Sequence, residues 1–284
     1  MEPMPLLGKV ARRSLFAGLM LASSIGFSVA HAAIVSFNAG GTGLSGAVPA
    51  TSAISVHGSG FAMSQFNPAT PAILSFTELG AYQLTQPDGV SPIGVRDVTL
   101  TYSVSGTLNA LTGALAFTSG LFSLYSDSIF NFGSASSNPG VMFGANDGTL
   151  IASFLITSGF GSASGTAHMN GAAVAGSILP GYFFSTGGED LSQSGDLSFA
   201  VDIDNMIDFS PSPTVVSEIV CKAAGFIGPG CDGTPYANSP YYFVVTDGGK
   251  ATLSTTVPEP GTLMLGVLGM AAIGVVRRRK VFGG

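Results

Sequence analysis

The sequence predicts an all-β protein, an antiparallel β-sandwich of short strands with one short helix near 213–224. Three observations favour this class. Apolar and polar residues alternate with a period of two in several stretches. Turn-forming residues separate these stretches at intervals of roughly 10 to 20 residues. Only 9% of the residues are charged and 40 are glycine, a composition typical of an exported, loop-rich β protein.

The strands are expected in a regular series along the chain. The clearest is Arg96 to Leu108, where apolar Val98, Leu100, Tyr102 and Val104 alternate with Thr and Ser. This alternation predicts a sheet with one face in water. The other strands are expected at 33–38, 54–61, 73–76, 82–84, 114–118, 121–127, 149–157, 174–179, 182–185, 196–204, 241–246 and 250–256.

The glycine loop after the first strand resembles a dinucleotide fingerprint only formally. Gly41, Gly43 and Gly46 have the required spacing, but Pro49 and a Ser/Thr/Ala run follow instead of a helix. An acidic residue at the right distance is also missing. We therefore predict a flexible loop.

The stretch after Ser212 has the pattern of a helix of about three turns. Ser212 is a candidate N-cap, Pro213 suits the first helical position, and Gly225 would end the helix. The apolar residues that would share one face of this helix are Val215, Val216, Ile219, Val220 and Ala223.

Cys221 and Cys231 are the only cysteines and lie ten positions apart. In an exported chain such a pair indicates a disulfide. A catalytic thiol would need a nearby base, and two cysteines do not complete a zinc site. The structural bridge is the interpretation that the spacing favours.

Histidines give no sign of catalysis. Only His57 and His168 remain once the N-terminal segment is set aside, neither has a metal-ligand spacing, and the chain has no Gly-x-Ser-x-Gly elbow. We interpret both as surface or strand residues. The chain is therefore not expected to be an enzyme.

The densest acidic cluster contains Asp202, Asp204 and Asp208, with Asn205 between them. Hard oxygen ligands suit Ca²⁺, which is the one candidate cofactor. Met206 and Ile207 stand where a calcium loop would need Asp or Asn and then Gly. A solvated strand end is the simpler interpretation. Paired carboxylates for glycoside hydrolysis are a further alternative, although the chain has no Trp for sugar stacking.

The N-terminus has the features of a secretory signal. Lys9, Arg12 and Arg13 precede an apolar stretch from Leu15 to Ala30, and Ala30-His31-Ala32 supplies the small residues that signal peptidase reads. We predict a signal helix over residues 1–32, with cleavage after Ala32.

The C-terminus combines a rigid break, a short apolar segment and a basic end. The break is Val257-Pro258-Glu259-Pro260-Gly261, and prolines here stop any helix or sheet from continuing. Residues 262–276 would form a membrane helix of roughly 23 Å against a hydrocarbon core of about 30 Å. Basic residues at the end of the chain would remain cytoplasmic by the positive-inside rule. They are Arg277, Arg278, Arg279 and Lys280.

This tail resembles the PEP-CTERM sorting signal, in which Pro-Glu-Pro precedes a short membrane helix and an Arg-rich end. The resemblance implies an exosortase, a membrane cysteine protease that removes the tail and releases or re-anchors the exported protein. The domains expected are thus a signal peptide at 1–32, an exported β domain at 33–257 and a sorting tail at 258–284. The protein would cross the inner membrane, be anchored there for a time and end at the cell surface or outside.

The exported domain is strongly acidic. Residues 33–257 hold three basic residues and fourteen acidic ones, for a net charge of −11. Nucleic acid is excluded as a partner, because binding phosphates needs clustered Lys and Arg. Contact with the membrane is expected only through the tail, because anionic lipid repels an acidic domain.

A second resemblance covers short segments of the domain, among them Leu121 to Asp127 and Tyr182-Phe183-Phe184. They are similar to exported PEP-CTERM proteins associated with flocculation. This implies a non-enzymatic protein of the extracellular matrix that contacts exopolysaccharide in biofilms or flocs. A glycan- or calcium-binding module built on Asp202 to Asp208 is the alternative, and an enzyme acting on matrix polysaccharide is the third.

Overall fold

The computed structural model describes residues 33–45, 47–49, 54–66, 68–162 and 165–255. The signal peptide, the PEP motif, the helix expected at 262–276 and the basic end all lie outside these ranges. Among the residues that are described, no helix has the length and apolar character needed to cross a membrane.

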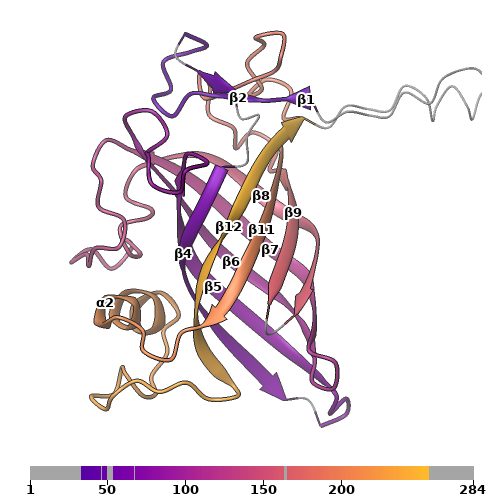
Figure 1. Ribbon diagram of the computed structural model, residues 1–284, viewed down its shortest axis with the longest axis vertical. Helices are drawn as coiled ribbons and strands as arrows, with labels where there is room; N and C mark the ends of the chain where they lie inside the picture. Colours follow the sequence, from indigo (N-terminus) through magenta and orange to yellow (C-terminus); the bar gives the residue numbers. More distant parts are fainter. Residues whose placement is uncertain (1–32, 46, 50–53, 67, 163–164, 256–284) are drawn as a thin grey trace, which may run out of the picture. The chain divides into compact units, whose positions relative to one another are not determined.

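Eight long strands of the described chain form one closed antiparallel barrel (Figure 1). Each strand pairs with its neighbours in the order β12-β11-β9-β8-β7-β6-β5-β4, and pairing of β12 with β4 closes the ring. At one end, β1 (Ala33–Ile34) pairs with the last residues of β12. The barrel strands are β4 (Ile54–Phe66), β5 (Ile73–Thr85), β6 (Asp97–Asn109), β7 (Ala114–Asp127), β8 (Thr149–Ser162), β9 (Thr166–Ala173), β11 (Ser198–Ile207) and β12 (Tyr242–Thr255).

The predicted sandwich of short strands is therefore wrong. The strands expected at 73–76 and 82–84 are one strand, β5, and those at 114–118 and 121–127 are one strand, β7. Glycines interrupt the apolar alternation inside these strands. A Cβ at Gly80 would collide with the backbone of β4, so this glycine permits close approach of two strands rather than a turn. Continuous strands of 13 or 14 residues are long enough to tilt and close on themselves.

The middle of the chain also differs from the prediction. Strand β9 was not predicted, because Thr-Ala-His-Met-Asn-Gly-Ala-Ala contains mostly small or polar residues rather than β-branched ones. No strand forms at 174–179, and only β10 (Phe183–Phe184) forms within 182–185.

Inward side chains fill the barrel with a continuous apolar core. The rings of Phe122 and Phe154 both pack against Phe199, at centroid distances of 5.4 and 5.3 Å. The upper end in Figure 1 is covered by a small sheet of β10, β2 (Ser36–Phe37) and β3 (Val48–Pro49), in which Phe37 stacks on Phe183. The core is thus sealed at that end.

The helix predicted near 213–224 is confirmed and packs on the outside of the barrel. It consists of α2 (Pro213–Val215) and η1 (Val216–Ala223), and the second part is a π-helix. The hydroxyl of Ser212 accepts a hydrogen bond from the Val215 amide, as expected of an N-cap. The helix buries its apolar side against Phe61, Ala81 and Val244 of β4, β5 and β12.

The predicted disulfide is also present in the structure. Cys221, on η1, is bonded to Cys231 in the loop that follows, with their Cα atoms 5.4 Å apart. This bond ties the end of the helix to the loop that leads to β12.

Candidate binding site on the outer wall of the barrel

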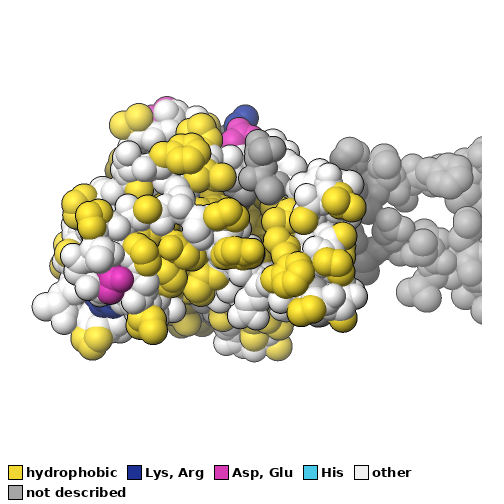
Figure 2. Space-filling view, turned by 90° about the horizontal axis from the view of Figure 1, so that it is seen from below, with side chains coloured by type: hydrophobic (Ala, Val, Ile, Leu, Met, Phe, Trp, Pro, Cys, Tyr) yellow, Lys and Arg dark blue, Asp and Glu magenta, His cyan; other side chains and the backbone are white. Residues whose placement is uncertain are grey.

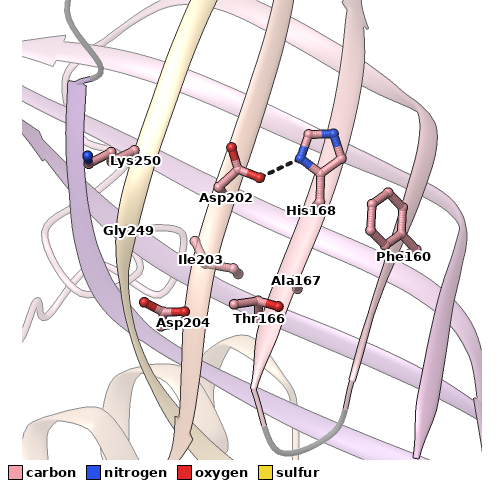
Figure 3. Close-up of a pocket in the computed structure, with 9 residues that line it drawn as sticks. All are labelled: Phe160, Thr166, Ala167, His168, Asp202, Ile203, Asp204, Gly249 and Lys250. Carbon is pink, nitrogen blue, oxygen red and sulfur yellow. Dashed lines mark hydrogen bonds and ion pairs between the residues drawn. The ribbon is translucent and has the colours of Figure 1, made fainter.

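Four neighbouring strands place Phe160, His168, Asp202 and Lys250 in one row across the outer wall. The sheet registers pair Phe160 with His168, His168 with Asp202, and Asp202 with Lys250. The row faces outward because the adjacent Val201 and Ile203 of β11 point into the core. Figure 3 shows the four side chains on β8, β9, β11 and β12.

Hydrogen bonds hold His168 in a fixed orientation. Its Nδ1 lies 2.5 Å from Oδ1 of Asp202, and its Nε2 lies 3.0 Å from the side-chain amide nitrogen of Asn170. Because that amide can only donate, Nε2 accepts and Nδ1 carries the proton that Asp202 accepts. Asn170 is itself held by Ser158 at 3.2 Å. Both ring nitrogens are therefore engaged in hydrogen bonds.

The row borders an open cavity of about 480 Å³. Phe160 offers an aromatic ring that is 65% exposed and stands 5.3 Å from the His168 ring. The cavity is also lined by a hydroxyl, two carboxylates and an amine, from Thr166, Asp202, Asp204 and Lys250. A volume of this size suits a small ligand. An exposed ring beside hydrogen-bonding groups fits the apolar face and the hydroxyls of a sugar.

The structure brings together only two of the three predicted calcium ligands. Asp202 and Asp204 share the outer side of β11, and both line the cavity. Asp208 is used elsewhere, since its carboxylate accepts hydrogen bonds from the Ser210 amide and the Thr246 hydroxyl. Within the described ranges, no three His, Cys, Asp or Glu side chains converge as a metal site. Calcium binding by the three residues remains a prediction.

None of the other predicted residues that the structure describes lines this cavity. His57 contacts Gln83 at 3.1 Å, on β4 and β5. The disulfide of Cys221 and Cys231 lies at the helix, and the sorting motif lies outside the described residues.

Inside the barrel, the structure reveals a polar cluster that sequence reasoning missed. The Tyr82 hydroxyl donates to Oδ2 of Asp247 at 2.8 Å, and the Tyr102 hydroxyl donates to Oε1 of Glu78 at 2.8 Å. The two rings stack with centroids 4.8 Å apart. The period of two in β5 could have revealed the cluster, because every second residue faces inward. These residues are Phe76, Glu78, Gly80, Tyr82 and Leu84.

Burial controls the protonation of this interior cluster. Desolvation raises the pKa of Glu78 above its ordinary 4.5, although the hydrogen bond from Tyr102 opposes the shift. Desolvation and then the charge of Glu78 raise the pKa of Asp247 well above 3.8. The pKa values of Tyr82 and Tyr102 are also raised, first by desolvation and then by the nearby carboxylates. The interior therefore favours neutral, protonated groups.

Comparison with known proteins identifies a sorting motif at the C-terminus. Residues 256–280 match the model of the PEP-CTERM protein-sorting motif. Neither curated proteins nor solved structures showed significant similarity to the chain. The motif marks an exported protein that is anchored in the membrane for a time and processed by an exosortase. The chain thus carries the PEP-CTERM sorting motif that its sequence predicted.

Proposed function

We propose that this protein is a non-enzymatic component of the extracellular matrix that binds exopolysaccharide through the outer cavity at Phe160, His168, Asp202 and Lys250. Its role would be to hold matrix polymer in biofilms or flocs. The single observation that carries the proposal is the exposed ring of Phe160 beside fixed polar groups on a rigid barrel wall.

The surroundings of the cavity agree with binding rather than catalysis. The His168 ring is held between Asp202 and Asn170, so its nitrogens position the site instead of transferring protons. The carboxylates of Asp202 and Asp204 can accept hydrogen bonds from sugar hydroxyls, and the Lys250 amine can donate them. A neutral or weakly charged polysaccharide fits a domain of net charge −11, because that domain repels a strongly anionic polymer.

The route to the matrix follows from the sorting motif. Signal peptidase would remove residues 1–32, and the helix at 262–276 would hold the protein in the inner membrane until the exosortase acts. The mature domain would then meet polymer at the cell surface or beyond it.

Isothermal calorimetry, in which the host's matrix polysaccharide is titrated into the protein, tests the proposed site. Phe160→Ala and Asp202→Asn should each weaken binding at least about tenfold, because they remove the stacking ring and the charge that orients His168. Phe209→Ala and Asp196→Asn change an exposed Phe and an exposed Asp elsewhere and should bind like the parent protein.

Two results would overturn the proposal. One is a parent protein that does not bind the polysaccharide, or that binds it as well after Phe160→Ala and Asp202→Asn. The other is the release of new reducing ends that stops after Asp202→Asn, which would make the protein a polysaccharide hydrolase.

A further inference from the structure

The interior cluster contains two buried oxygen atoms that have no hydrogen-bond partner. Tyr82 and Tyr102 supply one hydroxyl proton each to the carboxylates of Glu78 and Asp247. Tyr102 also lies 3.3 Å from Oδ2 of Asp247, but it has no second proton to donate. Oδ1 of Asp247 and Oδ1 of Asn205 are buried without a hydrogen-bond partner. Leaving such atoms unpaired is costly.

The barrel register brings these acceptors together at one level. Asn205 on β11 is directly opposite Asp247 on β12, and cross-strand partners on one face have Cβ atoms about 5 Å apart. Asp247 and Glu78 both lie within hydrogen-bonding distance of the Tyr102 hydroxyl. Space for this hydroxyl exists because Gly60 and Gly80 pair across β4 and β5 without side chains.

No basic side chain neutralises the two buried carboxyls. The domain has only three candidates, and none forms an ion pair with Glu78 or Asp247 within the described structure. Lys222 pairs with Glu218 outside the barrel, and Lys250 lines the outer cavity. Asp247 is only 2% exposed, so water does not screen its charge either.

A small cavity at the lower end of the barrel reaches this cluster. It has a volume of about 30 Å³ and is lined by Glu78, Asn205 and Ser64 among apolar neighbours. Figure 2 looks at this end, where hydrophobic side chains dominate the surface. The volume suffices for an ion or a water molecule and is far below the 300 Å³ or more of most small-molecule sites.

We propose that the barrel interior binds one hard, oxygen-coordinated cation, with Ca²⁺ as the first candidate, between Glu78, Asp247 and Asn205. Carboxylate and amide oxygens are the ligands such cations prefer. The ion would enter from the lower end, displace the protons that the two carboxyls hold, and bind the two unpaired oxygens. Its charge would balance the charge that deprotonation leaves on the carboxylates. This site is separate from the outer cavity and does not depend on glycan binding.

Terbium luminescence tests the site with the full chain. Tb³⁺ replaces Ca²⁺ and emits when a nearby excited tyrosine transfers energy to it, and the chain has no Trp to compete. Tb³⁺ should give tyrosine-sensitised emission at pH 7 that added Ca²⁺ reverses, while Na⁺ and Mg²⁺ compete less well. Glu78→Gln and Asp247→Asn should each weaken Tb³⁺ binding by about tenfold or more, since each removes a charged ligand.

Asp196→Asn is the matched control, because it removes an exposed acidic group that lines neither cavity and should leave emission unchanged. The proposal is overturned if the parent protein gives no Ca²⁺-reversible emission, which would mean that protons or water alone fill the cavity. It is also overturned if emission is lost in Asp202→Asn but kept in folded Glu78→Gln. Ca²⁺ should also raise the melting temperature of the parent protein, and this second readout needs no variant.

Discussion

The buried carboxyls of Glu78 and Asp247 couple the stability of the barrel to pH. Because burial raises the pKa of both groups, the folded state holds protons that the unfolded state releases. Their contribution to stability is fully present below the ordinary pKa values of 3.8 and 4.5. It is lost as pH rises through the higher values of the folded state.

In the presence of a chelator, the melting temperature should therefore fall by about 5 °C or more between pH 4 and pH 8. Asp247→Asn cannot release a proton, and its melting temperature should change less over the same range. Calorimetry across this range checks both results. A parent protein whose stability increases toward pH 8 would contradict the raised pKa values.

Gly60 provides the space that the Tyr102 hydroxyl occupies. A Cβ at this position would collide with that oxygen. Gly60→Ala should lower the free energy of unfolding by about 1 to 3 kcal/mol, as overpacking of a core does. The same change should cost less in a Tyr102→Phe background, because the colliding atom is gone.

Urea denaturation of the four proteins of this cycle measures the difference. Gly248→Ala is the control, since nothing lies within 4 Å of the added carbon there, and its stability should be close to that of the parent. Equal costs for Gly60→Ala with and without the hydroxyl would show that Tyr102 does not set the packing.

Single residues were only partly predictable from the sequence. The alternation of β11 correctly places Asp202 and Asp204 on its wet side. The partner of Asp202 could not be predicted, because His168 lies on β9, a strand without the usual apolar pattern. Glu78 was overlooked because an acidic residue in a strand is ordinarily assigned to the wet face.

At the scale of elements, the helix and its disulfide form one unit that covers the outer wall. The helix buries Ile219 and Val220 against Phe61, and the Cys221–Cys231 bond fixes its C-terminal end. Closing a loop of this length should stabilise the fold by about 3 kcal/mol.

Reduction with a thiol should therefore lower the melting temperature of the parent protein by several degrees, roughly 2 to 4 °C per kcal/mol for a domain of this size. A Cys221→Ser, Cys231→Ser double variant should melt at the lower temperature with or without the thiol. Thermal melts followed by circular dichroism compare the two proteins. A parent protein that melts identically in both conditions would show that the bond adds no stability.

Local signals made this element predictable. Ser212, Pro213 and Gly225 act through their nearest neighbours, and Gly225 has the left-handed φ of 64° that ends such helices. The π-helical geometry of η1 has no comparable sequence signal. The long strands were missed for the opposite reason, because glycines such as Gly80 and Gly120 interrupt the apolar alternation within β5 and β7.

For the whole molecule, closure of the barrel is the feature that local patterns could not supply. A sandwich and a barrel both alternate inward and outward residues with a period of two. The decision depends on the pairing of β4 with β12, such as Ile54 with Ala251, which are far apart in the sequence. The sorting motif, in contrast, was predictable, because it is one contiguous stretch of the sequence.

The proposed role requires that an exported barrel be retained by matrix polymer through its outer cavity. The most direct test is the amount of protein that sediments with the extracellular matrix of the native host. We expect the parent protein and Phe209→Ala to sediment with the matrix, while a Phe160→Ala, Asp202→Asn double variant is released into the medium. Equal retention of all three proteins would contradict the account.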